Sequence, residues 1–263
     1  MGKKLVILGN GPSLLDHQNN GDFELLKNVD TFGMNRLHML FEPDKDNGII
    51  GTDWRPTHYA MFEWFGEDTN SGGFWWRVVN YYLKPKVTKM YIGERFKDRM
   101  FHMANGIGLT ENSVLPSEWE FANDTVRFMK RCWNISHSSD TWDSRGYQEE
   151  DIWHLPVVCT FGGTITAAYQ IAFMLGYTDI AVIGCDLGIV PMKNDEGVFI
   201  DFNHFHPNYE TWGNLGVLDK SLVYTHKKAK EYYEVHGRTI VNAGIGGALE
   251  VFDRVKLSDW VGK

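Results

Sequence analysis

Four consecutive aliphatic residues, Leu5 to Leu8, run directly into Gly9 and Gly11 near the start of the chain. A short apolar run that ends in glycine is typical of a buried parallel strand followed by a tight turn. A helical pattern opens at Pro12 and Ser13, and proline suits the first turn of a helix because its missing N–H has no partner there. This order of strand, turn and helix favours an α/β fold.

The turn after this first strand is a candidate phosphate site. Glycines let the backbone approach a ligand, and the amides at the start of the next helix point toward it. Gly9, Gly11 and Ser13 are therefore candidate binding residues, together with Asn10, whose amide offers a donor and an acceptor to a sugar or base. The dinucleotide fingerprint is incomplete, because Leu14 stands where a third glycine is expected. An ordinary strand-to-helix turn explains the bare pattern equally well.

Apolar strands and helical patterns alternate along most of the chain. They predict one doubly wound, mainly parallel, Rossmann-like domain over residues 1–263. We expect further strands at 29–35, 57–62, 87–92, 157–161, 179–186 and 238–242, and helices at 23–27, 75–83, 117–130, 165–175 and 218–235. Residues 187–217 are polar and aromatic without a regular period, which predicts an inserted lid or substrate loop.

Two further glycine-containing turns follow predicted strands. One holds Gly162, Gly163 and Thr164, and the other runs from Asn242 to Gly247 with Gly246 inside it. The carboxyl ends of parallel strands meet at one edge of the sheet, where open α/β sheets bind their ligands. The three turns are therefore expected to converge. A purely structural role stays open, because α/β proteins commonly have glycines in such turns.

Two polar residues end predicted strands at the same edge. Asn35 follows the second strand and is expected beside Asn10. Asp186 ends the strand at 179–186, where it can bind a ribose or a lysine, or act as a structural cap.

The predicted lid holds two histidines in an aromatic setting, His204 and His206, followed by Tyr209. A neutral imidazole with a pKa near ~6.5 is suited to removing a proton from a sugar hydroxyl, and the tyrosine can hydrogen-bond a phosphate. His226, on the predicted amphipathic helix, is a further candidate base. Two surface histidines in a loop explain His204 and His206 equally well, whereas a lone helical histidine such as His226, beside Lys227 and Lys228, is more often a solvated residue. We expect no metal site, because no Cys or Glu accompanies the histidine pair at a recognisable spacing.

Composition excludes several classes of function. A net charge of −8 argues against nucleic acid as the main partner. The three cysteines show neither metal nor disulfide spacing, and the chain shows neither a membrane-length apolar run nor a signal peptide, so a cytoplasmic protein is expected. A P-loop and a Gly-x-Ser-x-Gly elbow are absent. The ten tryptophans suit either stacking platforms or an irregular core.

The order of these motifs resembles the bacterial lipooligosaccharide sialyltransferases and the related motility-associated-factor glycosyltransferases. The resemblance rests on residues 5–14, on the strand that ends at Asn35, and on residues 161–164, 183–187 and 241–249. It implies a Rossmann-like domain with a lid, which binds a CMP-activated acidic sugar without metal and transfers it to a glycan hydroxyl. The CMP-sugar is then a donor substrate, and no cofactor is implied.

The resemblance also implies roles for residues. Asn10 and Asn35 contact the cytidine phosphate and ribose, the turn at 162–164 faces the nucleotide or sugar, and the lid supplies the phosphate-binding tyrosine and the base. The base of the sialyltransferases falls near Lys220, where this chain has no histidine, so the three candidate histidines depart from the pattern.

Archaeal 6-hydroxymethylpterin diphosphokinase-like proteins resemble the same start and the same Gly-Gly turn. That resemblance implies diphosphate transfer with Mg²⁺ and carboxylates, for which Asp186 and Asp201 are candidates. A non-catalytic nucleotide-binding protein is a third interpretation. The partners expected for the transferase are a nucleotide-sugar donor and a glycan acceptor, and a homo-oligomer is left open.

Overall fold

The computed structural model describes residues 2–62, 89–93, 126–131, 157–158, 163–188, 203–207, 209 and 218–262. Its strands are β1 (Lys4–Leu8), β2 (Asp30–Met34), β3 (His58–Met61), β4 (Lys89–Gly93), β5 (Val126–Arg131), β6 (Val157–Val158), β7 (Asp179–Ile183) and β8 (Thr239–Asn242). The helices are α1 (Ser13–Asn19), α6 (Thr164–Met174), α7 (Leu218–Val235) and α8 (Leu257–Val261), with 3₁₀ helices η1 (Asp22–Asn28), η2 (Asn35–Leu40) and η3 (Lys45–Asn47).

These strands form one sheet in the order β6-β5-β4-β3-β2-β1-β7-β8, and every pairing within it is parallel. Strands β2 to β6 follow one another away from β1 on one side, whereas β7 and β8 lie on the other. The direction of winding therefore reverses between β1 and β7. Open α/β sheets bind ligands outside the carboxyl ends of strands at such a reversal.

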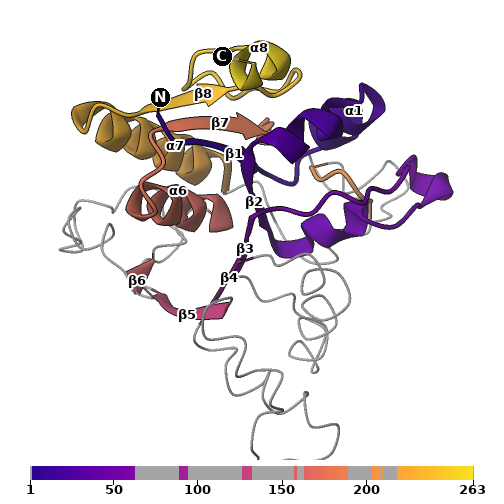
Figure 1. Cartoon of the computed structure of the whole chain (residues 1–263), viewed down its shortest axis with the longest axis horizontal. Helices are drawn as coiled ribbons and strands as arrows, with labels where there is room; N and C mark the ends of the chain where they lie inside the picture. Colours follow the sequence, from indigo (N-terminus) through magenta and orange to yellow (C-terminus); the bar gives the residue numbers. More distant parts are fainter. Residues whose placement is uncertain are drawn as a thin grey trace, which may run out of the picture.

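Both faces of the sheet are covered at β1, which explains why Leu5 to Leu8 are all apolar. Leu5 and Ile7 pack into a core with α6 and α7, whereas Val6 and Leu8 pack into a core with α1, η1, η2 and α8. Figure 1 shows α6 and α7 on one side of the β1–β7 pair and α1 on the other. A strand buried on both faces must be apolar at every position. The prediction of a doubly wound, parallel α/β fold is confirmed.

Most predicted elements lie within a few residues of the observed ones, but one element type is wrong. Residues 126–131 form strand β5 between β4 and β6, where a helix over 117–130 was predicted. Val126, Arg127 and Phe128 alternate with the two-residue period of a strand, which the helical interpretation overlooked. The predicted helix at 75–83 and most of the predicted lid lie outside the described residues.

Three buried histidines make the fold sensitive to acid. Burial lowers the pKa of His38 to about 3, of His58 to about 4 and of His226 to about 3. An unfolded histidine titrates near pH 6.5. Below that pH the unfolded chain therefore binds protons that the folded chain does not, and the free energy of unfolding falls as the pH falls toward 3 to 4.

We expect the urea midpoint to fall steadily between pH 6.5 and 5, with each of the three histidines contributing about 1.4 kcal/mol per pH unit at full effect. His226→Gln removes one of these three groups. The slope of the free energy of unfolding against pH should therefore fall by about one third, even though the variant is less stable at neutral pH. Urea unfolding of both proteins at several pH values measures this. An equal slope in the two proteins contradicts the assignment.

Candidate functional site

The carboxyl ends of β1 and β7 are joined through the half-buried carboxylate of Asp186. The backbone amide of Ser13 donates to Oδ2 of Asp186 at 2.8 Å, and the Ser13 hydroxyl donates to Oδ1 at 2.5 Å. The amide of Gly11 donates to the carbonyl of Gly184 at 2.8 Å. A side-chain anion of the protein therefore occupies the start of α1, the position where the sequence predicted a phosphate.

This packing accounts for the glycines of the first turn. A Cβ added to Gly9 would lie 2.2 Å from the carbonyl oxygen of Gly184, and one added to Gly11 would lie 2.4 Å from Oδ2 of Asp186. Of the two explanations that the sequence left open, these distances support close packing between turns. A ligand is not needed to explain why glycine stands at either position.

The turn after β8 packs against the same residue. The amide of Ala248 donates to the backbone carbonyl of Asp186 at 2.5 Å. A Cβ added to Gly247, whose φ is 70°, would lie 2.7 Å from that carbonyl oxygen. Two of the three predicted glycine turns thus meet at Asp186, as the sheet topology required.

The predicted binding residues of the β8 turn stabilise the turn itself. Asn242 is buried, donates through Nδ2 to the carbonyl of Leu249 at 2.8 Å and accepts through Oδ1 from the amide of Gly244 at 2.8 Å. Gly246 has a φ of 66°, which favours glycine, and its carbonyl accepts a hydrogen bond from Arg254 at 2.7 Å. The Asn242 amide is therefore already hydrogen-bonded at both ends within its own turn, and its predicted role in ligand binding stays a prediction.

Gly11→Ala should lower the free energy of unfolding by about 3 kcal/mol, because the new methyl group overlaps the Asp186 carboxylate that holds Ser13. Gly48→Ala is the matched control. Gly48 has a φ of 71° but an added Cβ meets no atom within 4 Å, so the conformational strain alone costs about 1–2 kcal/mol. Urea unfolding of both variants measures the difference. A smaller loss for Gly11→Ala than for Gly48→Ala contradicts the packing argument.

Asn10 lies between the ends of β1 and β2 and is 9% exposed. Its Nδ2 donates to the carbonyl of Met34 at 3.4 Å, whereas its Oδ1 is buried without a hydrogen-bond partner among the described residues. A buried unpaired acceptor costs about 1–3 kcal/mol. A ligand that brings an N–H or O–H donor to this atom recovers that energy, which a fully ionised phosphate cannot do. The geometry thus favours a hydroxyl or an amino group.

Asn35 brings a second asparagine and the turn before α6 to the same edge. Its Nδ2 lies 3.1 Å from the hydroxyl oxygen of Thr164, which follows Gly163 at the start of α6. Its own carbonyl accepts a hydrogen bond from the hydroxyl of Tyr59 at 2.6 Å. The structure therefore places Asn10, Asn35, Gly163 and Thr164 in one neighbourhood. Gly162 and Asp201 lie outside the described residues.

Backbone strain also concentrates at this edge. Among the described residues, two that are not glycine have a positive φ, namely Asn35 at 50° and Leu187 at 54°. They follow the ends of β2 and β7, on either side of β1. Left-handed backbone is unusual for leucine, and such strain is held in place mainly at functional sites.

Part of the predicted lid is docked onto the sheet. We call residues 203–207 together with Tyr209 the His204 segment. The amide of Phe205 donates to the carbonyl of Asn10 at 2.9 Å, and the side chains of Phe205 and Tyr209 are buried in the core with α1. His206 donates through Nε2 to Oδ2 of Asp44 at 3.2 Å. Hydrogen bonds from Asn47 and, to a smaller extent, from His206 lower the pKa of the Asp44 carboxyl.

The three candidate bases have different environments. His204 is half-buried and stacks on Tyr209 with ring centroids 4.0 Å apart and planes 13° apart. His206 is 6% exposed and is hydrogen-bonded to Asp44. His226 is 1% exposed, and its Nδ1 lies 2.9 Å from the hydroxyl oxygen of Tyr169 in the core between α6 and α7. His226 is thus a neutral core residue, contrary to its prediction as a base.

Arg36 was not among the site residues predicted from the sequence. Its Nη1 donates to the carbonyl of Tyr209 at 2.6 Å, and its amide donates to the Tyr209 hydroxyl at 3.4 Å. The Tyr209 hydroxyl, predicted to hydrogen-bond a phosphate, therefore lies against the backbone after β2. The available signal was a cationic residue directly after the strand-end Asn35.

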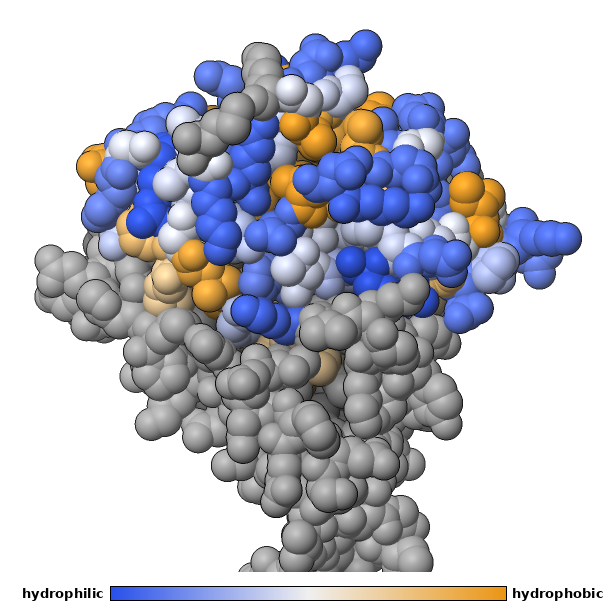
Figure 2. All heavy atoms as spheres, viewed as in Figure 1, coloured by the Kyte–Doolittle hydropathy of each residue, from blue (hydrophilic) through white to orange (hydrophobic). Residues whose placement is uncertain are grey.

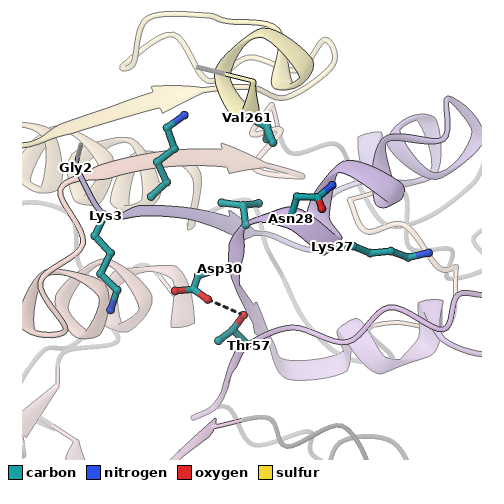
Figure 3. A pocket seen from close by; sticks show the side chains of 9 residues that line it. Gly2, Lys3, Lys27, Asn28, Asp30, Thr57 and Val261 are labelled. Carbon is teal, nitrogen blue, oxygen red and sulfur yellow. Dashed lines mark hydrogen bonds between the residues drawn. The ribbon is translucent and has the colours of Figure 1, made fainter.

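A cavity of about 640 Å³ lies at the opposite edge of the sheet, at the amino ends of β1 and β2. Figure 3 shows Lys3, Lys27, Asp30 and Thr57 among its lining, with the ammonium groups of Lys3 and Lys27 pointing away from each other. Lys3 lies near the carbonyl of Leu175 at the end of α6, at 3.4 Å. A cation there complements the negative end of the helix dipole. The lysines thus form no convergent anion site.

Three observations concern possible partners. Among the described side chains, no group of three or more His, Cys, Asp or Glu is arranged to hold a metal ion. Among the described helices, none has the length and apolar character needed to cross a membrane. Figure 2 shows hydrophilic side chains over most of the described surface on the face that it presents, interrupted by small apolar patches.

The fold and this edge define a Rossmann-like α/β protein with a polar, strained site where the winding of the sheet reverses. No protein-family model matches the sequence, and no curated protein shows significant similarity to it. Among solved structures, an asparagine-to-alanine variant of the sialyltransferase CST-II in complex with CMP is similar over 96% of this chain and 86% of that chain. The sequence identity is 14% and the TM-score is 0.42.

Proposed function

We propose that the protein is a metal-independent glycosyltransferase, which moves an acidic, sialic-acid-like sugar from a CMP-activated donor to a glycan hydroxyl. The observation that carries the proposal is the buried Oδ1 of Asn10 at the junction of β1 and β2, which has no hydrogen-bond partner within the described part of the chain. Ribose hydroxyls and the cytosine amino group are donors of the kind that this oxygen lacks. The motif order of the sequence supports a CMP-sugar as the molecule that brings them.

His204 is the base in this proposal. It belongs to a segment docked beside Asn10, whereas His206 is engaged with Asp44 and His226 lies in the core. The acceptor hydroxyl oxygen forms a bond to the anomeric carbon while the bond from that carbon to the phosphate oxygen breaks. The acceptor proton passes to the imidazole, and CMP leaves with the electron pair of the broken bond.

CMP should stabilise the protein without Mg²⁺, by about 2.7 kcal/mol at a concentration of 100 times its Kd. Thermal-shift measurements with CMP, CDP, UDP, GDP and ATP, each with and without Mg²⁺, test this. Stabilisation by ATP only with Mg²⁺ indicates diphosphate transfer instead. The absence of any stabilisation contradicts nucleotide binding.

Asn10→Ala should weaken CMP binding about tenfold, because it removes one hydrogen bond of about 1.4 kcal/mol. Asn28→Ala is the matched control, since Asn28 is an exposed asparagine at the opposite edge of the sheet. Calorimetric titration of both variants gives the two affinities. Equal CMP affinity in Asn10→Ala and the wild type would show that Asn10 does not bind CMP.

His204→Phe keeps an aromatic ring to stack on Tyr209 but removes both imidazole nitrogens. Turnover of a CMP-activated sialic acid should fall about 10²–10⁴-fold, as expected for the loss of a general base, with CMP affinity unchanged within about threefold. His236→Phe is the control, because His236 is exposed at the end of α7. Turnover at the wild-type rate in His204→Phe would show that His204 is not the base.

A further inference from the structure

We infer that Arg36 is a positioning residue, which holds the His204 segment over the end of β2 and so couples donor binding to the placement of the base. The inference rests on the proposed function for its catalytic meaning. Its structural content stands on six contacts between described residues.

Arg36 holds Tyr209 at both ends. The guanidinium donates to the Tyr209 backbone carbonyl at 2.6 Å, while the Arg36 amide donates to the hydroxyl at the far end of the ring at 3.4 Å. The first contact is a charge-assisted hydrogen bond between a half-buried cation and a neutral acceptor. Because one contact is at the backbone carbonyl of Tyr209 and the other at its hydroxyl, a movement of Tyr209 relative to Arg36 disturbs at least one of them.

Tyr209 in turn fixes His204. The two rings are stacked at 4.0 Å, and Tyr209 is 3% exposed, so its ring is a rigid platform within the core. His204 itself is half-buried, and its placement follows that of the platform. In this inference Arg36 sets the orientation of the imidazole through Tyr209.

Arg36 is connected to the proposed nucleotide site through the preceding residue, Asn35. Asn35 has a φ of 50°, and this left-handed turn directs its side chain to Thr164 while the next residue faces Tyr209. The hydroxyl of Tyr59 holds the backbone of this turn, because it donates to the carbonyl of Asn35 and accepts from the amide of His38. A CMP-sugar that binds at Asn35 thus contacts the backbone unit that, in this inference, positions His204.

The charge of Arg36 also fits this place. Asp186 fills the start of α1 with a negative charge, and the chain carries a net charge of −8. The described cation nearest in sequence to the strand-end asparagines is Arg36. Lysine can donate to one carbonyl but lacks the planar fork that keeps the guanidinium oriented, so Arg36→Lys should retain only part of the effect.

The test compares Arg36→Gln and Arg36→Lys with Arg55→Gln. Arg55 is a matched control, because its Nη1 also donates to backbone carbonyls, in this case those of Thr52 and Trp54 in its own turn, at 2.7 and 2.8 Å. The first readout is the proton NMR signal of the His204 imidazole, identified by its loss in His204→Phe. Stacking on Tyr209 shifts this signal through the ring current.

We expect Arg36→Gln to move the His204 signal toward the position of a solvated histidine, Arg36→Lys to move it partway, and Arg55→Gln to leave it unchanged. In the transfer reaction Arg36→Gln should lower kcat by about 10–100-fold, the effect of a misplaced catalytic group, while the KM for the donor changes less than threefold. Arg36→Lys should recover part of kcat.

Two results overturn the inference. One is an unchanged His204 signal in Arg36→Gln, whatever happens to turnover. The other is a moved signal with an unchanged kcat in an active enzyme. If the wild-type protein neither binds CMP nor transfers sugar, the proposed function fails separately, and the imidazole signal still decides whether Arg36 positions His204.

Discussion

The carboxylate of Asp186 on the amide and hydroxyl of Ser13 is the interaction on which the site depends. It joins the turns after β1 and β7, and the backbone carbonyl of the same residue receives the turn after β8. Without it, the Ser13 amide would be left unpaired at a half-buried position, which is unfavourable by about 1–3 kcal/mol. Because the three turns pack so closely, glycine is required at Gly9 against the Gly184 carbonyl, at Gly11 against the Asp186 carboxylate and at Gly247 against the Asp186 backbone.

This internal anion changes where a ligand is recognised. In dinucleotide-binding folds the start of the first helix receives a phosphate, but here a carboxylate already satisfies the Ser13 amide. A ligand phosphate placed there would meet a like charge at short range. We therefore expect a ligand to bind at the junction of β1 and β2 instead. There the Oδ1 of Asn10 has no partner among the described residues, and Asn35 has a strained backbone.

The sequence predicted the framework of this edge but not the roles within it. Strands such as β1 and β7 are recognisable because burial on both faces demands an unbroken apolar run, and glycine after such a run marks a tight turn. The role of each glycine depends on which other turn packs against it, and Gly11 and Asp186 are distant in sequence. His226 was misjudged because the neighbouring Lys227 and Lys228 suggested a solvated face, although a helix turns by about 100° per residue. Arg36 was missed because its partner, Tyr209, lies 173 residues further along the chain.

A transferase without a metal has to derive its rate from orientation and from protein charges. The backbone after β2 suits that requirement, because the left-handed conformation of Asn35 directs the side chains of Asn35 and Arg36 toward different partners. Asn35 faces the turn before α6, and Arg36 faces the segment that carries His204. The peptide unit between them cannot rotate freely, since the Tyr59 hydroxyl binds the Asn35 carbonyl and the Tyr209 hydroxyl binds the Arg36 amide. Under the proposed function, a displacement at Asn35 can therefore reach the His204 segment through this hydrogen-bonded peptide plane, in addition to the hydrogen bond from Phe205 to the Asn10 carbonyl. A shared backbone unit of this kind explains why a polar residue accepts the strain of a positive φ where glycine would be relaxed.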